Sequence, residues 1–112
     1  MIQRINPQPQ WSDAVVHNGT AYFVEVPESG TDITSQTLAL LAQAERTLSL
    51  CGSDKSRLLQ ATIYLKQMSD RATFNAVWAQ WLPQGCAPVR VCVSAEMASP
   101  DTSESTAAAA AS

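Results

Sequence analysis

The segment Ala14-Val-Val-His-Asn-Gly-Thr-Ala-Tyr-Phe-Val-Glu-Val26 sets the fold at the start of this 112-residue chain. Its Asn18-Gly19 pair accepts the positive φ angles of a tight type I′ turn. The β-branched and aromatic residues on either side of the turn favour extended backbone. We therefore predict an antiparallel hairpin, with strands Ala14–His17 and Thr20–Val26.

Downstream of the hairpin the hydrophobic pattern changes to that of a helix. We expect this helix to run from Ile33 to Cys51, with Leu38, Leu41 and Leu48 near one face and Gly52 as its stop. The next segment, Leu58 to Lys66, is rich in strand formers and is predicted to be a third strand.

A second helix is predicted after Ser69-Asp70, which can supply its cap. The spacing i, i+3, i+4 and i+7 indicates one buried stripe, made of Phe74, Val77, Trp78 and Trp81. We expect these aromatic residues to belong to the core. Pro83 and Gly85 end the helix, and Val89 to Ala95 is predicted to be a fourth strand.

The resulting order, β-β-α-β-α-β, predicts an α+β fold in which two helices cover one face of a mixed sheet. We assign residues 1–100 to a single domain, since a chain of this length builds one core. Residues 101–112 are low in complexity and poor in strand formers, which is typical of a degenerate last strand or a frayed tail.

Alternation in the fourth strand places Val89, Val91 and Val93 on one face and Arg90 and Cys92 on the other. We expect both helices to cover the valine face. Arg90 then lies on the second face, among apolar and aromatic neighbours such as Tyr64 or Phe23. Such a face is too apolar for water, so we expect it to pack against copies of the same chain.

Composition supports subunit contacts. Charged residues make up only 15% of the chain, against a usual share of about 25%, and hydrophobic residues make up 46%. The formal charge is -3 and the lysines and arginines are scattered, so we expect no nucleic-acid partner.

No segment approaches the roughly 18 apolar residues that a membrane span needs, so we expect no membrane partner and a cytoplasmic protein. Three cysteines without a CxxC pair argue against a disulfide framework and a zinc site. With one histidine, His17, a metal centre is poorly supplied.

Several short motifs resemble those of the Rid family, the reactive intermediate deaminases or YjgF-type proteins, and most closely its YoaB-like subgroup. The similarity runs from about Arg4 to Pro100. The set ending in Pro-x-Arg-x-Cys is its most specific part. In chain order the motifs are Asn18-Gly19, Gln36-Thr37, Gly52-Ser-Asp-Lys-Ser-Arg57, Ala61-Thr-Ile-Tyr-Leu-Lys66, Phe74-Asn75 and Ala87-Pro-Val-Arg-Val-Cys92.

The resemblance implies a chorismate-mutase-like fold and a homotrimer whose sheets face inward, with three sites in the clefts between subunits. The implied activity is that of a 2-iminobutanoate/2-iminopropanoate deaminase, a hydrolase. It converts reactive enamine or imine acids such as 2-aminoacrylate to 2-keto acids and ammonia. No metal or other cofactor is implied.

The resemblance also implies roles for three residues. Arg90 matches the arginine that clamps the substrate carboxylate, for which its planar fork is suited. Cys92 lies beside the ligand and contributes backbone contacts, and Trp11 borders the site. Two simpler readings stay open: Arg90 as a salt bridge between subunits, and Cys92 as a small buried hydrophobe.

Two departures concern the catalytic residues. Active relatives place a glutamate on the final strand, where it orients the attacking water. A match without gaps puts Ser105 there, with Glu104 one residue away, and a slip of one residue would turn Glu104 to the opposite sheet face. Glu25 lies where relatives usually have glycine, and it would pair with Arg90, repel an anionic substrate, or replace the missing base.

Three functions are consistent with these residues. The first is a Rid-type deaminase, with normal or weakened activity. The second is a non-catalytic trimer that binds or senses small carboxylates through the same clefts. The third is a structural trimer without a ligand, in which Arg90 only bridges subunits.

Overall fold

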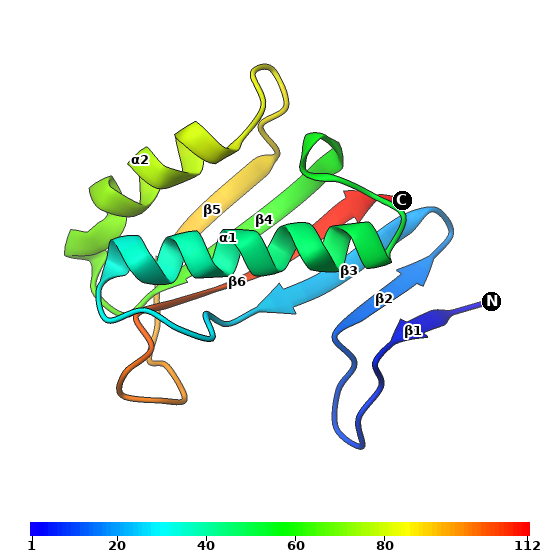
Figure 1. The fold of residues 1–112 in the computed structure, drawn as a ribbon, viewed down its shortest axis with the longest axis horizontal. Helices are drawn as coiled ribbons and strands as arrows, with labels where there is room; N and C mark the ends of the chain where they lie inside the picture. Colours follow the sequence, from blue (N-terminus) through cyan, green and yellow to red (C-terminus); the bar gives the residue numbers. More distant parts are fainter.

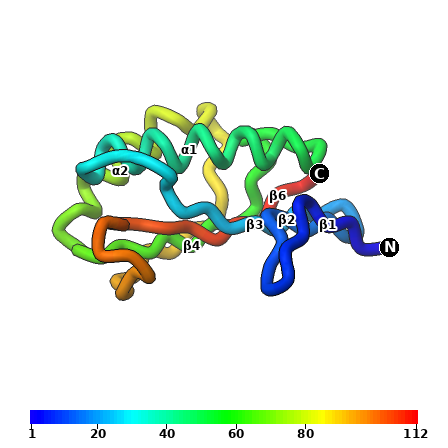
Figure 2. The backbone as a smooth tube through the Cα atoms, turned by 60° about the horizontal axis from the view of Figure 1, so that its bottom comes forward, coloured from blue at the N-terminus to red at the C-terminus, as the bar shows by residue number.

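One mixed sheet of six strands, with both helices on one side, makes up the computed structural model of residues 1–112 (Figure 1; Figure 2). The strand order is β1-β2-β3-β6-β4-β5. The strands are β1 (Gln3–Ile5), β2 (Ala14–His17), β3 (Thr20–Glu25), β4 (Leu58–Leu65), β5 (Val89–Ser94) and β6 (Glu104–Ala111). The helices are α1 (Ile33–Leu50) and α2 (Arg71–Trp81), and 3-10 turns at Lys55–Arg57 and Met68–Asp70 precede β4 and α2.

The predicted hairpin is confirmed as β2 and β3. Ala14 pairs with Phe23 and His17 with Thr20 in an antiparallel register. Asn18 and Gly19 take φ angles of 51° and 77°, the left-handed backbone that a type I′ turn requires. A further short strand, β1, pairs with β2 and was not predicted from the sequence.

Helix α1 begins at a capping box, in which Asp32 accepts from the Ser35 backbone and the Ser35 hydroxyl reaches back to the cap. Its predicted bounds are confirmed to within one residue. Leu41 and Leu48 are buried as predicted, but Leu38 is 58% exposed, so its assignment to the core face is wrong. The buried face also carries polar side chains, including Thr37 and Gln43, which bond to groups on the sheet.

Helix α2 confirms the second predicted helix, and Phe74 and Trp78 form its buried stripe. Val77 and Trp81 pack against the edge of the core. The predicted side-chain cap is absent, because the helix continues directly from the 3-10 turn at Met68–Asp70 and Asp70 makes no capping bond.

Strand β6 overturns the frayed-tail alternative for residues 101–112. Glu104–Ala111 pairs with β3 on one side and with β4 on the other, in the middle of the sheet. Alanine has little intrinsic preference for strands, so the composition of this segment concealed a central strand. Strand β6 passes beneath α1 (Figure 1), and Ala110 is fully buried.

The expected faces of β5 are reversed. Val89, Val91 and Val93 are 70%, 50% and 37% exposed, on the sheet face that no helix covers (Figure 2). Arg90 and Cys92 point to the helix side instead, where α2 half-buries them. The expectation failed because it assumed that the more apolar face of a strand meets the helices. Both faces of this sheet are apolar.

The two residues expected beside Arg90, Phe23 and Tyr64, lie on opposite faces of the sheet. Phe23 is buried on the helix side, whereas Tyr64, which pairs with Val93, lies on the open face. We call the uncovered side the open face; it carries Tyr22, Val24, Thr62, Tyr64, Val89, Val91, Val93, Ser105, Ala107 and Ala109. Neither helix has the length and hydropathy needed to cross a membrane.

Removal of residues 104–112 tests the central position of β6. We expect the truncated chain to lose cooperative thermal unfolding altogether, because β3 and β4 would each be left with an unpaired edge and an uncovered core. Circular dichroism during heating measures this loss. Removal of residues 1–2, which precede β1, is the control and should leave the transition intact. A sharp transition in the chain without β6 would contradict the assignment.

Candidate functional site

Arg90 is held in one orientation by helix α2. Its Nη2 atom donates a hydrogen bond of 2.7 Å to Asn75 Oδ1. Its guanidinium carbon lies 5.7 Å from the ring centroids of both Phe74 and Trp78. Contacts of this kind between a cation and aromatic rings are favourable, especially where the charge is partly desolvated. The aromatic stripe of α2 therefore positions the guanidinium as well as filling the core.

No carboxylate in the chain pairs with this guanidinium. The ion pairs of the structure are Arg46–Glu28 and Lys55–Glu45. Arginine has five N–H donors, and Asn75 accepts from only one of its terminal nitrogens. A half-buried, oriented guanidinium with free donors is suited to bidentate binding of a carboxylate.

Asn75 belongs to the Phe74-Asn75 motif, but it was assigned no role from the sequence. Its position one residue after the buried Phe74 places it at the edge of the stripe, facing β5. A polar residue at that border of an amphipathic helix is the signal that sequence reasoning missed.

Cys92 lies two residues after Arg90 on the same side of β5. It is half-buried, carries a free thiol and packs against the core cluster. Its strand partner is the fully buried Ile63. The structure thus brings Cys92 and Arg90 together, and the packing of the thiol is that of a small hydrophobe.

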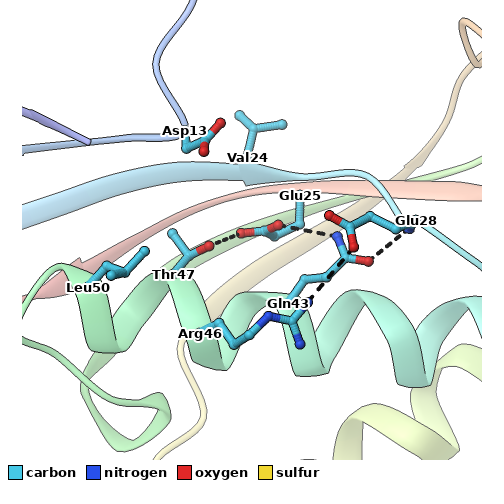
Figure 3. Close-up of a pocket in the computed structure, with 8 residues that line it drawn as sticks. All are labelled: Asp13, Val24, Glu25, Glu28, Gln43, Arg46, Thr47 and Leu50. Atoms are coloured by element: carbon cyan, nitrogen blue, oxygen red, sulfur yellow. Dashed lines mark hydrogen bonds and ion pairs between the residues drawn. The ribbon is translucent and has the colours of Figure 1, made fainter. Parts of the chain in front are cut away.

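Glu25, at the end of β3, lies on the floor of a polar hollow of about 260 Å³ between β3 and α1 (Figure 3). The residue is 9% exposed. Thr47 Oγ1 donates to Oε2 at 2.6 Å, and Gln43 Nε2 lies 3.4 Å from Oε1. Arg46 and Glu28 also line the hollow.

Burial raises the pKa of Glu25, and the negative charges of Asp13 and Glu28 act in the same direction. The hydrogen bonds from Thr47 and Gln43 oppose this rise without cancelling it. A carboxyl group with an elevated pKa beside an open hollow is able to exchange protons closer to neutral pH.

The pair proposed between Glu25 and Arg90 does not form within one chain. Glu25 pairs with Thr106 of β6, and β4 then separates β6 from β5. Three strand spacings amount to about 14 Å, beyond the reach of an ion pair. The polar partners of Glu25 are instead Thr47 and Gln43.

Trp11 is 62% exposed and lies in the loop between β1 and β2. That loop is at the opposite end of the sheet from β5, so Trp11 is not a neighbour of Arg90 in the same chain. Trp11 and Glu25 lie toward one end of the sheet, and Arg90 and Cys92 lie at the other.

The register of β6 decides the orientation of Glu104 and Ser105. Glu104 points to the helix side and is fully buried beneath α1, where Thr37 Oγ1 lies 2.7 Å from Oε2. Ser105 points to the open face, and its hydroxyl lies 3.9 Å from the Met97 sulfur. Neither residue approaches Arg90, which lies two strands away. Burial raises the pKa of Glu104 to about 7.

The family model described as Endoribonuclease L-PSP matches residues 1–110. The chain is 43% identical over 100 residues to the RutC family protein YoaB of Escherichia coli (strain K12), covering 88% of each sequence. It is 36% identical over 103 residues to a RutC family protein of Haemophilus ducreyi, covering 90% of this chain and 88% of that one.

Solved structures agree with these matches. NMB1025 of Neisseria meningitidis, described as a member of the YjgF protein family, superimposes with a TM-score of 0.97 at 39% identity, covering 99% of this chain and 94% of that chain. Rv2704 of Mycobacterium tuberculosis shares the fold, with a TM-score of 0.91 at 21% identity and full coverage of both chains. From the family model, the sequence identities and the shared fold together, we conclude that this chain belongs to the YjgF/RutC family, also called Rid.

Proposed function

We propose that this protein binds a small 2-imino or 2-keto carboxylate through Arg90 and hydrolyses the imine to a 2-keto acid and ammonia. The observation that carries the proposal is the guanidinium itself: it is half-buried, held by Asn75 and two aromatic rings, and has no carboxylate partner. Holding a buried charge without an internal partner is costly, so the arrangement favours a ligand that supplies the negative charge.

We further propose a homotrimer in which the open faces meet. Three exposed valines and Tyr22, Val24 and Tyr64 give this face little affinity for water, and the chain has few charges to spread over a monomer surface. The distribution of the candidate residues supports the same assembly. Arg90 and Cys92 lie at one end of the sheet and Trp11 and Glu25 toward the other, so only a second copy can complete a site that contains all four.

In the proposed reaction Arg90 holds the substrate carboxylate by two parallel hydrogen bonds, and the backbone near Cys92 orients the molecule. An enamine first gains a proton on carbon and loses one from nitrogen to become the imine. Water then adds to the imine carbon, and one of its protons passes to nitrogen. The remaining hydroxyl proton follows to nitrogen as the carbon–nitrogen bond breaks, which releases ammonia and the keto acid. No redox step occurs.

Among the three candidate catalytic residues, Glu25 is the one we assign to the water. It lines an open hollow, and its raised pKa suits a group that accepts and returns a proton. Glu104 is fully buried within its own chain, and Ser105 faces the open side of the sheet. Burial keeps Glu104 away from a substrate, and a serine hydroxyl without an adjacent base is a poor proton acceptor.

A second function, a trimer that binds carboxylates without catalysis, is favoured by one specific observation. The final strand offers no carboxylate on the helix side near Arg90: beyond Glu104 its helix-side positions are Thr106, Ala108 and Ala110. If Glu25 does not replace the missing acid, Arg90 retains the ligand but nothing activates water. An RNA substrate, as the name of the matching family model suggests, is disfavoured by the charge of -3.

Replacement of Arg90 tests the carboxylate clamp. In an assay coupled to a serine or threonine dehydratase, we expect Arg90→Ala to lower kcat/KM for keto-acid release at least about 30-fold, equivalent to about 2 kcal/mol of lost charged hydrogen bonding. Arg90→Lys should recover only part of the rate, because an ammonium lacks the planar fork. Equal rates for all three proteins, no faster than buffer, would overturn the deaminase.

Thermal shift with 2-ketobutyrate then separates the two remaining functions. Stabilisation of the wild type but not of Arg90→Ala, without catalysis, supports the binding protein. No stabilisation of either protein leaves a structural trimer.

Replacement of Glu25 tests the proposed base. We expect Glu25→Gln to lower kcat about 100-fold, within the usual range for a positioned acid or base, while thermal shift by 2-ketobutyrate is retained. Glu45→Gln, an exposed carboxylate on α1 outside this hollow, is the matched control and should keep the wild-type rate. Wild-type turnover by Glu25→Gln would remove Glu25 from the mechanism.

The proposed trimer is tested at the open face. We expect the wild type to have a solution mass near three times the 12.0 kDa of one chain, and Val91→Glu to be a monomer, because a charge would be buried without a partner. Ala79→Glu, on the exposed surface of α2, should remain trimeric. Light scattering after gel filtration measures the masses. A monomeric wild type would contradict the interface.

A further inference from the structure

Glu104 is a fully buried carboxyl group that the proposed reaction does not use. It lies at the start of β6, beneath the first turns of α1, and pairs across the sheet with Leu65 of β4. No lysine, arginine or histidine forms an ion pair with it. Its Oε1 atom is buried and has no hydrogen-bond partner.

The contacts of Thr37 limit where the protons can be. Thr37 Oγ1 lies 2.7 Å from the carbonyl oxygen of Ile33, the bond that a helical threonine commonly makes to the preceding turn. The same oxygen lies 2.7 Å from Glu104 Oε2. A hydroxyl has a single hydrogen to donate. If that hydrogen goes to Ile33, the short contact with Glu104 is a hydrogen bond only when the carboxyl group supplies the second proton.

Electrostatics around the carboxyl group favour the same state. Ionisation would leave a charge with no cation beside it and one oxygen with no donor, which is costly in a buried site. Asp70, at the start of α2, is the charged group that acts on Glu104, and its negative charge also opposes ionisation. Burial is the largest cause of the elevated pKa, which is about 7.

We infer that Glu104 is a neutral carboxylic acid in the folded protein, donates its proton to Thr37, and so forms a proton-dependent link between helix α1 and the central strand β6. The chain of donors runs from Glu104 to Thr37 and from Thr37 to the Ile33 carbonyl. The link is part of the fold and does not depend on the proposed deaminase activity.

The hydrogen bonds of Gln36, next to Thr37, determine how far the loss of the Glu104 proton affects the structure. Gln36 donates to the Asp101 carbonyl at 2.8 Å and accepts from the Ser103 backbone at 2.8 Å, so it ties α1 to the segment just before β6. Loss of the Glu104 proton leaves the Gln36 bonds in place. We therefore expect the change to be local: the contact between Thr37 and Glu104 weakens, while Gln36 still holds residues 101–103 against α1.

The sign of the pH dependence follows from the two states. In the unfolded chain Glu104 ionises with a pKa near 4.5, whereas in the folded chain it keeps its proton to about 7. Between these values the unfolded state loses a proton that the folded state retains, so stability falls as pH rises. The folding equilibrium constant should fall about tenfold per pH unit from 4.5 to about 7 and then level off.

The experiment compares chemical unfolding of the wild type and Glu104→Gln from pH 5 to 8.5. The amide of glutamine donates to Thr37 without a titrating proton, so we expect this variant to lack the Glu104 share of the pH dependence and to exceed wild-type stability above pH 7. Glu96→Gln, an exposed glutamate in the loop before β6, is the matched control and should follow the wild type. An unchanged pH dependence in Glu104→Gln would overturn the inference.

Carbon-13 NMR of the wild-type carboxyl groups provides a second readout that needs no altered Glu104. We expect a glutamate that titrates near pH 7 and still does so in Glu25→Gln, since burial raises the pKa of Glu25 as well. Thr37→Val, which removes the proton acceptor, should shift this titration, and Thr37→Ser should preserve it. The absence of any glutamate that titrates near pH 7 in Glu25→Gln, where Glu104 is unaltered, would refute the neutral acid. Neither experiment measures deaminase activity, so failure here leaves the proposed function untouched.

Discussion

The pairing of β6 between β3 and β4 is the constraint on which the rest of this structure depends. The hairpin of β2 and β3 is connected to β4 and β5 only through this strand, which completes the hydrogen-bond ladders on both sides. A sheet divided at this point would expose two edges and the apolar residues beneath α1. The short side chains of β6 make the arrangement possible, because they leave room for α1 to pack closely over the sheet.

The helix side of the sheet combines core packing with polar function at its border. Phe74 and Trp78 fill the space under α2, and the same rings hold the guanidinium of Arg90. Asn75 binds the guanidinium from the side, so the cation has few conformations left to lose when a ligand arrives. A preorganised group of this kind gains affinity because the ordering has already occurred during folding.

Two carboxylates and one arginine lie in different environments along the sheet. Glu25 lies beside an open hollow and exchanges hydrogen bonds with α1, whereas Glu104 is sealed beneath the same helix. Both residues face the helices, and the difference comes from their positions along α1. Glu104 lies beneath the first turns of α1, whereas Glu25 lies beside Thr47 in the last turns of that helix. Arg90, at the far edge, has no carboxylate at all. In the proposed trimer, the separated groups Glu25 and Arg90 would belong to one site.

The sequence by itself determined the hairpin, both helices, β4 and β5, because turn chemistry and hydrophobic spacing act over a few neighbouring residues. It also identified Arg90 as a charged residue within an apolar strand. The ordered motifs indicated the family. Tertiary structure alone decided which face of β5 meets the helices, since both faces are apolar and alternation does not tell them apart. It likewise decided that the alanines of β6 form a central strand, and that Glu104 lies inside and Ser105 outside. Pairing with β3 and β4 sets that register, and it cannot be predicted from residues 101–112 alone.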